Sequence, residues 1–519
     1  MSNLLDKSSI VLTPTAYDNS KVLCVKPSDG SGDFDFSRNS AATRVNAQGL
    51  VENVQILSSN LVQNGDFATD TAWVKVNATI SGGTGNLNGT GVTSLLFQNI
   101  LTNGKTYTAT FTISNYNSLG SAKLINNNGA AIYTITSNGT FTITFTHSNA
   151  SGNFIFRAIS GAIYSIDNVS VIEITTDTNL PRINYEGFSY DGSGNVVPDS
   201  GCGSWLFEPQ STNLITQSEL FSDSSWSTYG VETSVTFDAS QANPSGSNGS
   251  YIIEGLGGLR RFGTIVPVTP NTDYMISFYV KNINATFLKL LMTNGTGSVV
   301  YTSQVNSTDW SRVEIDFTSG AGTSATIQFL RDLPIGESVY IWGVQVEEQS
   351  YATSYIPTSG SSVTRNQDLC TNGGSLASIN STEGTLYFEG AALFSGSNAQ
   401  ISLSDGTNDN GVKFRFDLSA NRFTCFIRGN GGSTAAKTVI SSPQTDNNKI
   451  ALVWNATNLK IWINGVEAGT TATNDLPVGL DTLNFASNTG VLPFFGKTKA
   501  LAVWKEALTD AELTALTTI

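Results

Sequence analysis

Apolar and polar residues alternate with a period of two through most of the chain. The clearest segments are rich in β-branched and aromatic residues and lie at 105–113, 139–147, 273–280, 324–330 and 458–465. Each segment is expected to be a half-buried strand, because successive side chains of a strand point to opposite faces. The turn dipeptides between such segments include Asn138-Gly139, Asn294-Gly295 and Asn464-Gly465, whose second residue readily takes a positive φ. The pattern predicts an all-β chain of antiparallel sandwiches.

One helix is expected, at the C-terminus. Thr509 is followed three residues later by Glu512, which is the spacing of a capping box, and an apolar turn ends at Leu516. We expect this helix to cover the neighbouring sheet.

Two stretches of the chain begin and end alike, which indicates a duplicated module. The first runs from NLVQNGDFATDTAW (60–73) to YSIDNVSVIE (164–173), and the second from TNLITQSELFSDSSWS (212–227) to VYIWGVQVEEQ (339–349). Both open with an Asn-Leu pair and a Phe…Trp pair, and both close on an alternating strand. A jelly roll whose first and last strands are neighbours has this layout.

Length and charge narrow the class of protein. With 519 residues the chain is too long for a single core, and three or four modules are expected. Only 13% of the residues are charged, against about 25% in ordinary soluble domains, as in many extracellular and virion proteins. The net charge of −14 repels nucleic acid and anionic membranes, so neither is expected as a partner.

Cysteine and histidine usage argues against metal and redox motifs. The four cysteines, Cys24, Cys202, Cys370 and Cys425, lie far apart without a CxxC pair, and His147 is the single histidine. Zinc-ribbon and dithiol motifs are therefore excluded, and four isolated thiols are expected, with a Cys24–Cys202 disulfide as the minor alternative. No signal-like or membrane-spanning apolar stretch occurs, which favours a protein made in the host cytoplasm and released inside a particle.

The duplicated stretches resemble jelly rolls of the carbohydrate-binding modules that are appended to glycosidases and phage proteins. Four further segments resemble, in the same order, segments of tail-fibre and head-fibre (appendage) proteins of tailed bacteriophages, including crAss-like phages. These segments are FSRNSAATRVNAQGLVE (36–52), LPRINY (180–185), WLFEPQSTNLITQSELFSDSSW (205–226) and SYIPTSGSSVTRNQD (354–368). The resemblance covers most of residues 36–368.

In those phage proteins the first of the four segments runs almost directly into the second, whereas here residues 60–176 intervene. The first jelly roll is therefore expected to be inserted into a loop of a framework. Neighbouring chain ends make such an insertion feasible. We expect residues 36–58 and 177–212 to pack together across it.

The C-terminal part resembles the laminin-G and concanavalin A-like lectin sandwich in three segments, at 384–394, 449–469 and 499–516. The expected organisation is an N-terminal anchoring and framework segment (1–58), an inserted jelly roll (59–176), a connector (177–211), a second jelly roll (212–365) and a lectin-like module (366–519).

Catalysis is not expected. Glu314 and Asp316 imitate the acidic strand of concanavalin-like glucanases, but Ser319 stands where a third carboxylate belongs, and the strand lies in the second jelly roll. An ordinary strand with Arg312, Glu314 and Asp316 toward water is expected instead. His147 is expected on a surface strand, which leaves a catalytic triad without a suitable base.

Sugar binding is the activity that the sequence supports, because aromatic faces stack on sugars while amides and carboxylates bind the hydroxyls. Four tryptophans at module starts or in mid-strand are expected in the core: Trp73, Trp226, Trp342 and Trp454. The carbohydrate-binding candidates on loops are Tyr116, Arg428, Asn430 and Trp504.

The resemblance to carbohydrate-binding modules implies one calcium site, at Asp66 and Asp167, since calcium takes oxygen ligands. Ala68 replaces the acidic residue usual in the family. The second jelly roll has Gly343 in place of the aspartate, so no equivalent site is expected there. No other cofactor is expected.

The favoured interpretation is a virion structural protein, a phage fibre or appendage on the particle surface that contributes to adhesion to host-surface glycans. Residues 1 to about 35 would attach it to capsid or tail proteins, and a homodimer or homotrimer is expected. One alternative is a purely architectural head fibre or capsid decoration protein that binds no glycan. The other is a polysaccharide depolymerase, against which the missing carboxylate pair argues.

Overall fold

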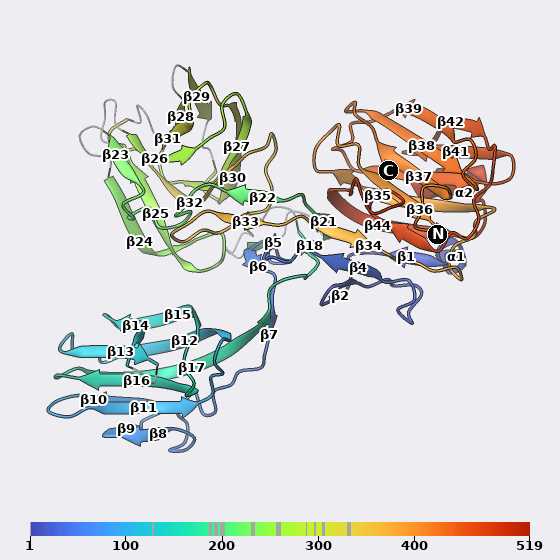
Figure 1. Cartoon of the computed structure of the whole chain (residues 1–519). Coiled ribbons are helices and arrows are strands. Elements are labelled where there is room, and N and C mark those ends of the chain that lie inside the picture. Colours follow the sequence, from blue (N-terminus) through green and yellow to red (C-terminus); the bar gives the residue numbers. More distant parts are fainter. Residues whose placement is uncertain are drawn as a thin grey trace. The chain divides into compact units, whose positions relative to one another are not determined.

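The computed structural model describes residues 2–126, 129–185, 189–190, 196–197, 203–229, 234–255, 261–286, 288–294, 297–303, 307–329 and 334–519. Cys202 and Gly295, which the sequence singled out, lie outside these ranges. The chain divides into two compact units, Gln55–Asp177 and the combination of Met1–Val54 with Thr178–Ile519 (Figure 1). Across the described ranges, neither helix has the length and apolar character that crossing a membrane requires.

The smaller unit is a sandwich of two antiparallel sheets. One sheet has the order β15 (Gly139–Thr146), β12 (Thr106–Ser114), β17 (Ile163–Thr176), β10 (Thr84–Asn88) and β9 (Ala78–Ser81), with β7 (Ile56–Leu57) also paired to β17. The other has the order β14 (Ala131–Ile135), β13 (Ser121–Ile125), β16 (Asn153–Ile159), β11 (Ser94–Asn99) and β8 (Val74–Val76). Because β7 pairs with the last strand, the unit begins at Gln55, before the expected boundary at residue 59.

The second sandwich belongs to the larger unit and also has two five-stranded sheets. One has the order β23 (Ser227–Tyr229), β26 (Arg261–Pro267), β31 (Ser324–Phe329), β28 (Leu288–Asn294) and β29 (Gly297–Ser303). The other has the order β24 (Ser234–Ala242), β25 (Asn248–Glu254), β32 (Ser338–Glu347), β27 (Asp273–Asn282) and β30 (Ser311–Thr318).

The two sandwiches are duplicates in topology. Strands β8 to β17 in chain order pair with one another in the same way as strands β23 to β32. Trp73 Nε1 donates to the Asn64 carbonyl at 3.0 Å, and Trp226 Nε1 donates to the Gln217 carbonyl at 2.8 Å. These matching strands and contacts confirm the duplication that the sequence predicted.

The C-terminal sandwich completes the larger unit. Its first sheet has the order β18 (Ile183–Asn184), β21 (Ser204–Phe207), β44 (Gly496–Trp504), β35 (Gly384–Ala392), β40 (Asn448–Trp454), β41 (Asn458–Ile463) and β42 (Val466–Ala472), with β1 (Ile10–Leu12) also on β44. Its second sheet has the order β39 (Ala435–Ile440), β38 (Arg422–Arg428), β37 (Gly411–Phe416), β36 (Gln400–Ser404) and β43 (Thr482–Asn484).

The N-terminal residues of the expected segment 1–58 form part of this sandwich, and their role in anchoring stays a prediction. A small sheet joins β2 (Tyr17–Asp18), β3 (Lys21–Val22), β4 (Phe34–Ser37) and β34 (Leu369–Thr371). The apolar side chains of this segment belong to the core of the C-terminal sandwich: Ile10, Leu12, Val22, Phe34 and Phe36. Removing such side chains from water stabilises a fold, so the segment is held here by its own sequence.

Two helices lie against the C-terminal sandwich. The helix α2 (Asp510–Thr517) has the expected capping box between Thr509 and Glu512, and its Leu513 is buried against Trp462 and Trp504. A six-residue helix, α1 (Ser2–Lys7), was not expected. Helices this short form only when other parts of the chain hold them, and Trp504 Nε1 donates to the Leu4 carbonyl at 2.8 Å.

The framework around the inserted unit consists of short pairs: β5 (Thr43–Val45) with β6 (Val51–Asn53), β22 (Ser211–Asn213) with β33 (Val363–Arg365), and β19 (Ser189–Tyr190) with β20 (Val196–Val197). The chain before the insertion contacts the chain after it. The backbone amides of Arg38 and Asn39 donate to Asn179 Oδ1 at 2.8 and 2.7 Å, and Arg38 Nη2 donates to the Leu180 carbonyl at 3.0 Å.

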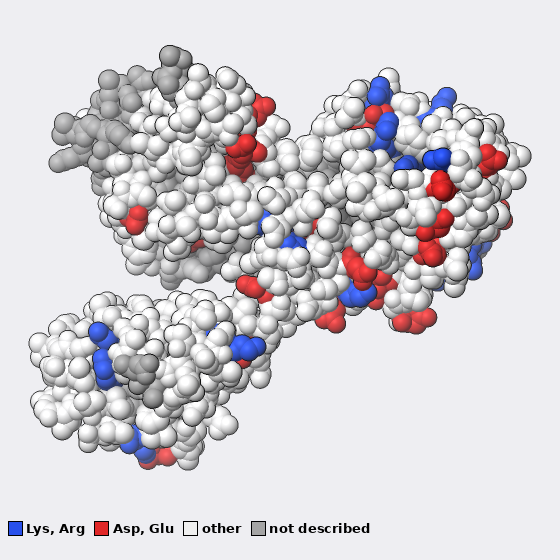
Figure 2. All heavy atoms as spheres, in the orientation of Figure 1, with Lys and Arg blue, Asp and Glu red and all other residues white. Residues whose placement is uncertain are grey.

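Charged side chains are sparse on the face shown in Figure 2, where small groups of Lys, Arg, Asp and Glu lie in a mostly uncharged surface. This agrees with the low charged fraction of the sequence. A cluster of charged side chains is therefore unusual in this protein and indicates a place with a structural or functional role.

Candidate functional site

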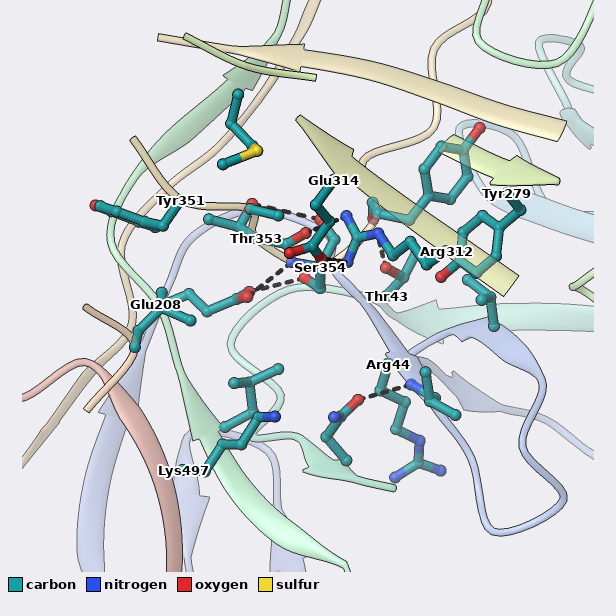
Figure 3. Close-up of a pocket in the computed structure, with 18 of the residues that line it drawn as sticks. Thr43, Arg44, Glu208, Tyr279, Arg312, Glu314, Tyr351, Thr353, Ser354 and Lys497 are labelled. Carbon is teal, nitrogen blue, oxygen red and sulfur yellow. Dashed lines mark hydrogen bonds and ion pairs between the residues drawn. The ribbon is translucent and has the colours of Figure 1, made fainter. Parts of the chain in front are cut away.

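A pocket of about 700 Å³ lies within the larger unit (Figure 3). Five parts of the chain line it: the β5–β6 hairpin, β18 and β21 with Glu208, the adjoining faces of β27 and β30, residues 350–355, and Leu393 with Lys497 of the C-terminal sandwich. Such a size is usual for small-molecule sites, which fall between about 300 and 1,000 Å³.

One wall of the pocket is the outer face of the sheet that contains β27 and β30. Tyr279 and Arg312 are directly opposite each other on these strands, and Ser277 is opposite Glu314. Arg312 Nη2 donates to Ser277 Oγ at 2.9 Å and to the Thr353 carbonyl at 2.6 Å, and its guanidinium lies 5.8 Å from the centre of the Tyr279 ring. These contacts hold the guanidinium at the edge of the pocket.

The expected orientation of this strand is correct for two of its charged residues and wrong for the third. Glu314 and Asp316 are exposed, whereas the Arg312 side chain is only 23% exposed. Residues 353–355 cover that part of the sheet and draw the arginine inward. A periodic pattern identifies the outer face of a strand but not the segment that covers it.

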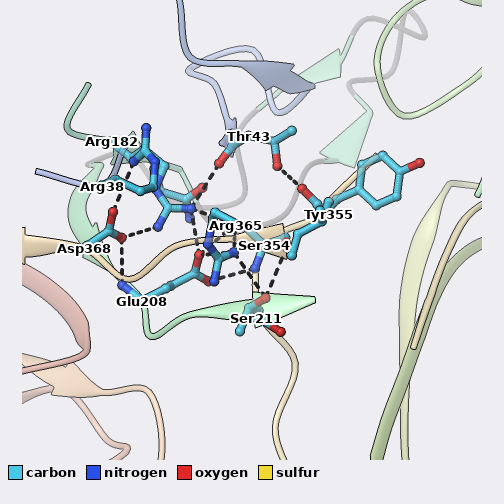
Figure 4. Close-up of polar contacts among 12 residues, drawn as sticks. Arg38, Thr43, Arg182, Glu208, Ser211, Ser354, Tyr355, Arg365 and Asp368 are labelled. Carbon is cyan, nitrogen blue, oxygen red and sulfur yellow. Dashed lines mark hydrogen bonds and ion pairs between the residues drawn. The ribbon is translucent and has the colours of Figure 1, made fainter. Parts of the chain in front are cut away.

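A buried ionic cluster lies beside the pocket (Figure 4). Arg182 Nη1 and Arg365 Nη1 contact Glu208 Oε2 at 2.7 and 2.8 Å, while Arg38 Nη1 contacts Asp368 Oδ1 at 3.1 Å. Arg182 also pairs with Asp368. The exposed fraction of all five side chains is 2% or less. The cluster therefore joins the two sides of the insertion to the second sandwich and to the start of the C-terminal one.

Glu208 lines the pocket but is not available for acid–base chemistry. Burial by itself would raise its pKa, but the charges of Arg365 and Arg182 outweigh burial and lower the pKa to about 2. It also accepts hydrogen bonds from the amide and the hydroxyl of Ser354, both at 2.7 Å. A general acid must carry a proton near the working pH, so Glu208 cannot serve as the general acid of a glycoside hydrolysis.

The remaining walls supply an aromatic ring and further cations. Tyr351 stacks on Phe394 with ring centres 4.2 Å apart, and burial raises the pKa of Tyr351 to about 12. Arg44 pairs with Glu52 at 2.9 Å, and Lys497 points toward the same space (Figure 3). The pocket thus combines donors, the Glu314 carboxylate and aromatic rings, a combination that suits sugar recognition.

The four sugar-binding candidates from the sequence lie outside this pocket. Trp504 is fully buried and cannot stack on a ligand, so that prediction is wrong. Arg428 donates to the carbonyls of Gly432, Asn408 and Gly431 at 3.0, 3.2 and 2.9 Å and so holds the β38–β39 loop together.

Asn430 is exposed in the β38–β39 loop and has a positive φ of 48°. Tyr116 belongs to the smaller unit and packs partly against its core. Arg428 and Asn430 therefore share one loop region, whereas Trp504 is buried and Tyr116 belongs to the other unit. The sequence drew attention to Arg312 and Glu314, but it did not connect them to a pocket because the other lining residues come from distant segments.

The structure decides several other placements. The tryptophans expected in the core are buried, with exposures of 6%, 5%, 4% and 0% for Trp73, Trp226, Trp342 and Trp454. His147 is 1% exposed rather than on the surface, and its Nε2 lies 2.9 Å from the Ser151 carbonyl. The loop after its strand folds back over it, which the alternation could not indicate.

Three of the four cysteines lie in the described ranges, and all three are free thiols. Burial raises the pKa of Cys24 and of Cys425 to about 12 and also raises that of Cys370. The alternative of a Cys24–Cys202 disulfide does not occur at Cys24, while Cys202 lies outside the described residues.

Asp66 and Asp167, the calcium residues that the resemblance implies, lie in neighbouring segments of the smaller unit, because the Val169 amide donates to the Gly65 carbonyl at 2.8 Å. The Asp66 carboxylate accepts from the Ala68 amide at 3.3 Å, and that of Asp167 accepts from the Asn168 amide at 2.7 Å. Within the described ranges, no group of three or more His, Cys, Asp and Glu could hold a metal ion.

The strand register changes which residue of the second jelly roll corresponds to Asp167 of the first. Thr112 is opposite Asp167, and Tyr279 is opposite Trp342. Trp342 therefore corresponds to Asp167, and Gly343 corresponds to the following residue. The second jelly roll thus has an indole where the first has a carboxylate.

Comparison with known proteins supports the fold of the C-terminal sandwich. A family described as the Concanavalin A-like lectin/glucanases superfamily matches residues 375–514. Together with the observed sheets, the match confirms the all-β class with a concanavalin A-like module. A search of the curated proteins gave no match.

Solved structures with partial similarity were also found. The CBM40 of Ruminococcus gnavus IT-sialidase, bound to alpha2,3 sialyllactose, is 19% identical, with 28% of this chain and 91% of that chain covered and a TM-score of 0.25. The CBM22-1 xylan-binding domain of Paenibacillus barcinonensis Xyn10C is 16% identical, with 27% and 94% covered and a TM-score of 0.22. The enzymatically active domain of tailspike protein 4 from bacteriophage CBA120 is 17% identical, with 26% of this chain and 21% of that chain covered and a TM-score of 0.22.

Proposed function

We propose that this chain is a non-catalytic, glycan-binding structural protein of a virus particle, a phage fibre or appendage that holds host-surface sugars in the pocket of its larger unit. The observation that carries the proposal is the pocket itself. It brings Arg312, Glu314 and Tyr351 around a space of about 700 Å³. Hydroxyl groups of a sugar can bond to the first two while its C–H face lies on an aromatic ring.

The state of the carboxylates supports binding without hydrolysis. Glu208 is ionised and saturated by two arginines and Ser354, so it cannot protonate a leaving group. Glu314 is 49% exposed and remains as an acceptor for sugar hydroxyls. A depolymerase would need a second carboxyl group that exchanges protons.

The virion assignment rests on the sequence resemblance of residues 36–368 to phage appendage proteins. The small charged fraction and the β-sandwiches suit a protein that is exposed on the surface of a particle. Homo-oligomers are usual for such appendages, and several copies of a weak site on one particle bind with avidity. The site of synthesis would be the host cytoplasm and the final location the particle surface.

A glycan array with the full chain, followed by titration of the strongest ligand, tests the binding. Glu314→Gln keeps the shape of the side chain and removes its charge, so we expect affinity to fall about tenfold, as for one charge-assisted hydrogen bond. Asp316→Asn is the matched control, because it makes the same change on the same exposed face of the strand and does not line the pocket. A blank array, or equal affinities for both variants, would overturn the proposal and favour an architectural protein.

Two further measurements separate the alternatives. A labelled antibody against the chain, imaged on intact particles, should decorate the head or the tail; undecorated particles contradict the virion assignment. Incubation with host polysaccharide should release no reducing ends, and their release would revive the depolymerase.

A further inference from the structure

We infer that the second sandwich has a separate binding site for an uncharged oligosaccharide, in a hollow of about 500 Å³ beside the β24–β25 hairpin. The hollow is lined by the segment that opens the sandwich, by the hairpin, by Trp342 of β32 and by residues 357–359. It shares no lining residue with the pocket described above. The inference therefore does not depend on the proposed function of that pocket.

An exposed phenylalanine marks the hollow. The Phe237 residue is 55% exposed although it lies in a regular strand. Its ring packs over Gly249, where an added Cβ would come within 2.7 Å of the ring, and Gly249 has a φ of +118° that disfavours other residues. Tyr251, directly opposite on β25, contacts the ring with centres 5.1 Å apart. The aromatic surface is thus held in place while it faces water.

Keeping a large apolar ring in water forgoes the stabilisation of burying it, so a fixed, exposed ring is more useful for binding than for folding. The C–H faces of sugars stack on such rings. The ring alone would suit many apolar ligands, and its surroundings decide between them.

The rim of the hollow is rich in amides and hydroxyls. Its polar lining residues are Gln217, Glu219, Asn243, Ser247, Asn248, Thr358 and Ser359. Among the described residues that line it, none is Lys, Arg or His, and Glu219 is the one charged group. Its Oε1 accepts from the Tyr355 hydroxyl at 2.8 Å, which keeps the carboxylate at the rim. Burial raises the pKa of Glu219, so the selectivity rests on the described lining, which has no cation to pair with an acidic ligand and has amides and a carboxyl group that bind neutral hydroxyl groups.

The duplicated sandwich provides an internal comparison. By strand register, Phe237 and Tyr251 correspond to Ile80 and Gly85 of the first sandwich. The first sandwich joins these two strands through Gly82-Gly83, whereas the second extends the connection through Asn243–Ser247. Asn243 orders the longer loop, since its Oδ1 accepts from the Ser245 amide at 2.9 Å and its Nδ2 donates to the Gly249 carbonyl at 3.0 Å.

The same topology therefore forms without the aromatic pair and without the amide-bearing loop. Features that the fold does not need, gathered around one hollow, point to a ligand. An uncharged oligosaccharide fits both the aromatic pair and the amide-bearing loop. The C–H faces of its rings can stack on the aromatic pair, and the hydroxyl groups at its edges can bind the amides.

Titration calorimetry of the full chain with neutral cello-, xylo-, manno- and chito-oligosaccharides tests the site. Sialylated and uronate-containing oligosaccharides are titrated for comparison as acidic ligands. We expect at least one neutral oligosaccharide to bind. Phe237→Ala should weaken that binding about tenfold, while Phe237→Trp should retain it. Ile265→Ala is the matched control, because Ile265 is 58% exposed on β26 of the same sandwich and does not line the hollow.

Glu314→Gln distinguishes this site from the first pocket, because binding of a neutral ligand that persists when the first pocket has lost its carboxylate belongs to the hollow. Binding of acidic oligosaccharides alone, or equal binding by Phe237→Ala and the wild type, would overturn the inference and leave the first pocket untouched. Loss of neutral-ligand binding in Glu314→Gln would also overturn it, by placing the ligand in the first pocket. Unchanged melting temperatures show that each variant is folded.

Discussion

The buried ionic cluster offers a sharp test through Asp368→Asn. Asp368 is 1% exposed and accepts hydrogen bonds from Arg38 Nη1 at 3.1 Å and from the Glu208 amide at 2.8 Å, in addition to its pair with Arg182. The substitution keeps the size of the side chain but leaves buried positive charge without its partner. Breaking a buried pair from one side costs about 3–5 kcal/mol.

Asp35→Asn is the matched control. Asp35 pairs with Lys21 at 2.6 Å, but its side chain is 51% exposed, and exposed pairs contribute at most about 1 kcal/mol. Both substitutions are Asp→Asn changes within the larger unit. Their difference isolates the effect of burial.

Differential scanning calorimetry measures the effect. The larger unit has roughly 400 residues, so its unfolding entropy is about 0.8 kcal/mol/K, and a loss of 3–5 kcal/mol lowers its melting temperature by about 4–6 °C. The transition of Gln55–Asp177 should not move and serves as an internal reference. A shift for Asp368→Asn within about 1 °C of the control would refute the reasoning that the cluster holds the framework together.

Four further predictions follow from the same structure. The pKa of Glu208 is about 2 in the folded chain, which is lower than in the unfolded chain. Its contribution to stability is therefore full above about pH 5 and is lost as the pH falls toward 2. Acid-unfolding curves of the larger unit should show this loss, and a stability that does not change with pH contradicts it. In a Cys202→Ser variant at pH 8, Ellman's reagent should leave Cys24, Cys370 and Cys425 unmodified until denaturant is added. The thiolate is the reactive form, and the raised pKa values keep these three side chains as thiols. Fast labelling of the native protein contradicts the raised pKa values. Replacing residues 55–177 by a short Gly-Ser linker should leave a soluble larger unit that unfolds cooperatively at an unchanged melting temperature, because Arg38 and Asn39 contact Asn179 directly. A molten product counts against an inserted module. If calcium binds at Asp66 and Asp167, a dissociation constant of about 1 mM is expected. Calcium at 10 mM should then raise the melting temperature of the isolated fragment 55–177 by about 4–8 °C relative to chelator. Equal melting temperatures for the wild type and Asp66→Asn in calcium rule the site out.

The sequence by itself determined the local elements. Alternation placed strands at 105–113 and 139–147, which are β12 and β15 and pair with each other. The turn at Asn464-Gly465 has φ values of 51° and 88°, as the dipeptide predicts, and the Thr509 capping box begins α2. These features depend on residues a few positions apart, so local steric and hydrogen-bonding preferences suffice to specify them.

The tertiary structure alone decided the sites. The first pocket combines Arg44, Arg312 and Lys497, and the ionic cluster joins Arg38 to Asp368, which are 330 residues apart. Alternation shows which face of a strand is apolar but not which distant segment covers the other face. For this reason Arg312, Trp504 and His147 were expected at the surface, and packing against remote segments buried each of them wholly or in large part.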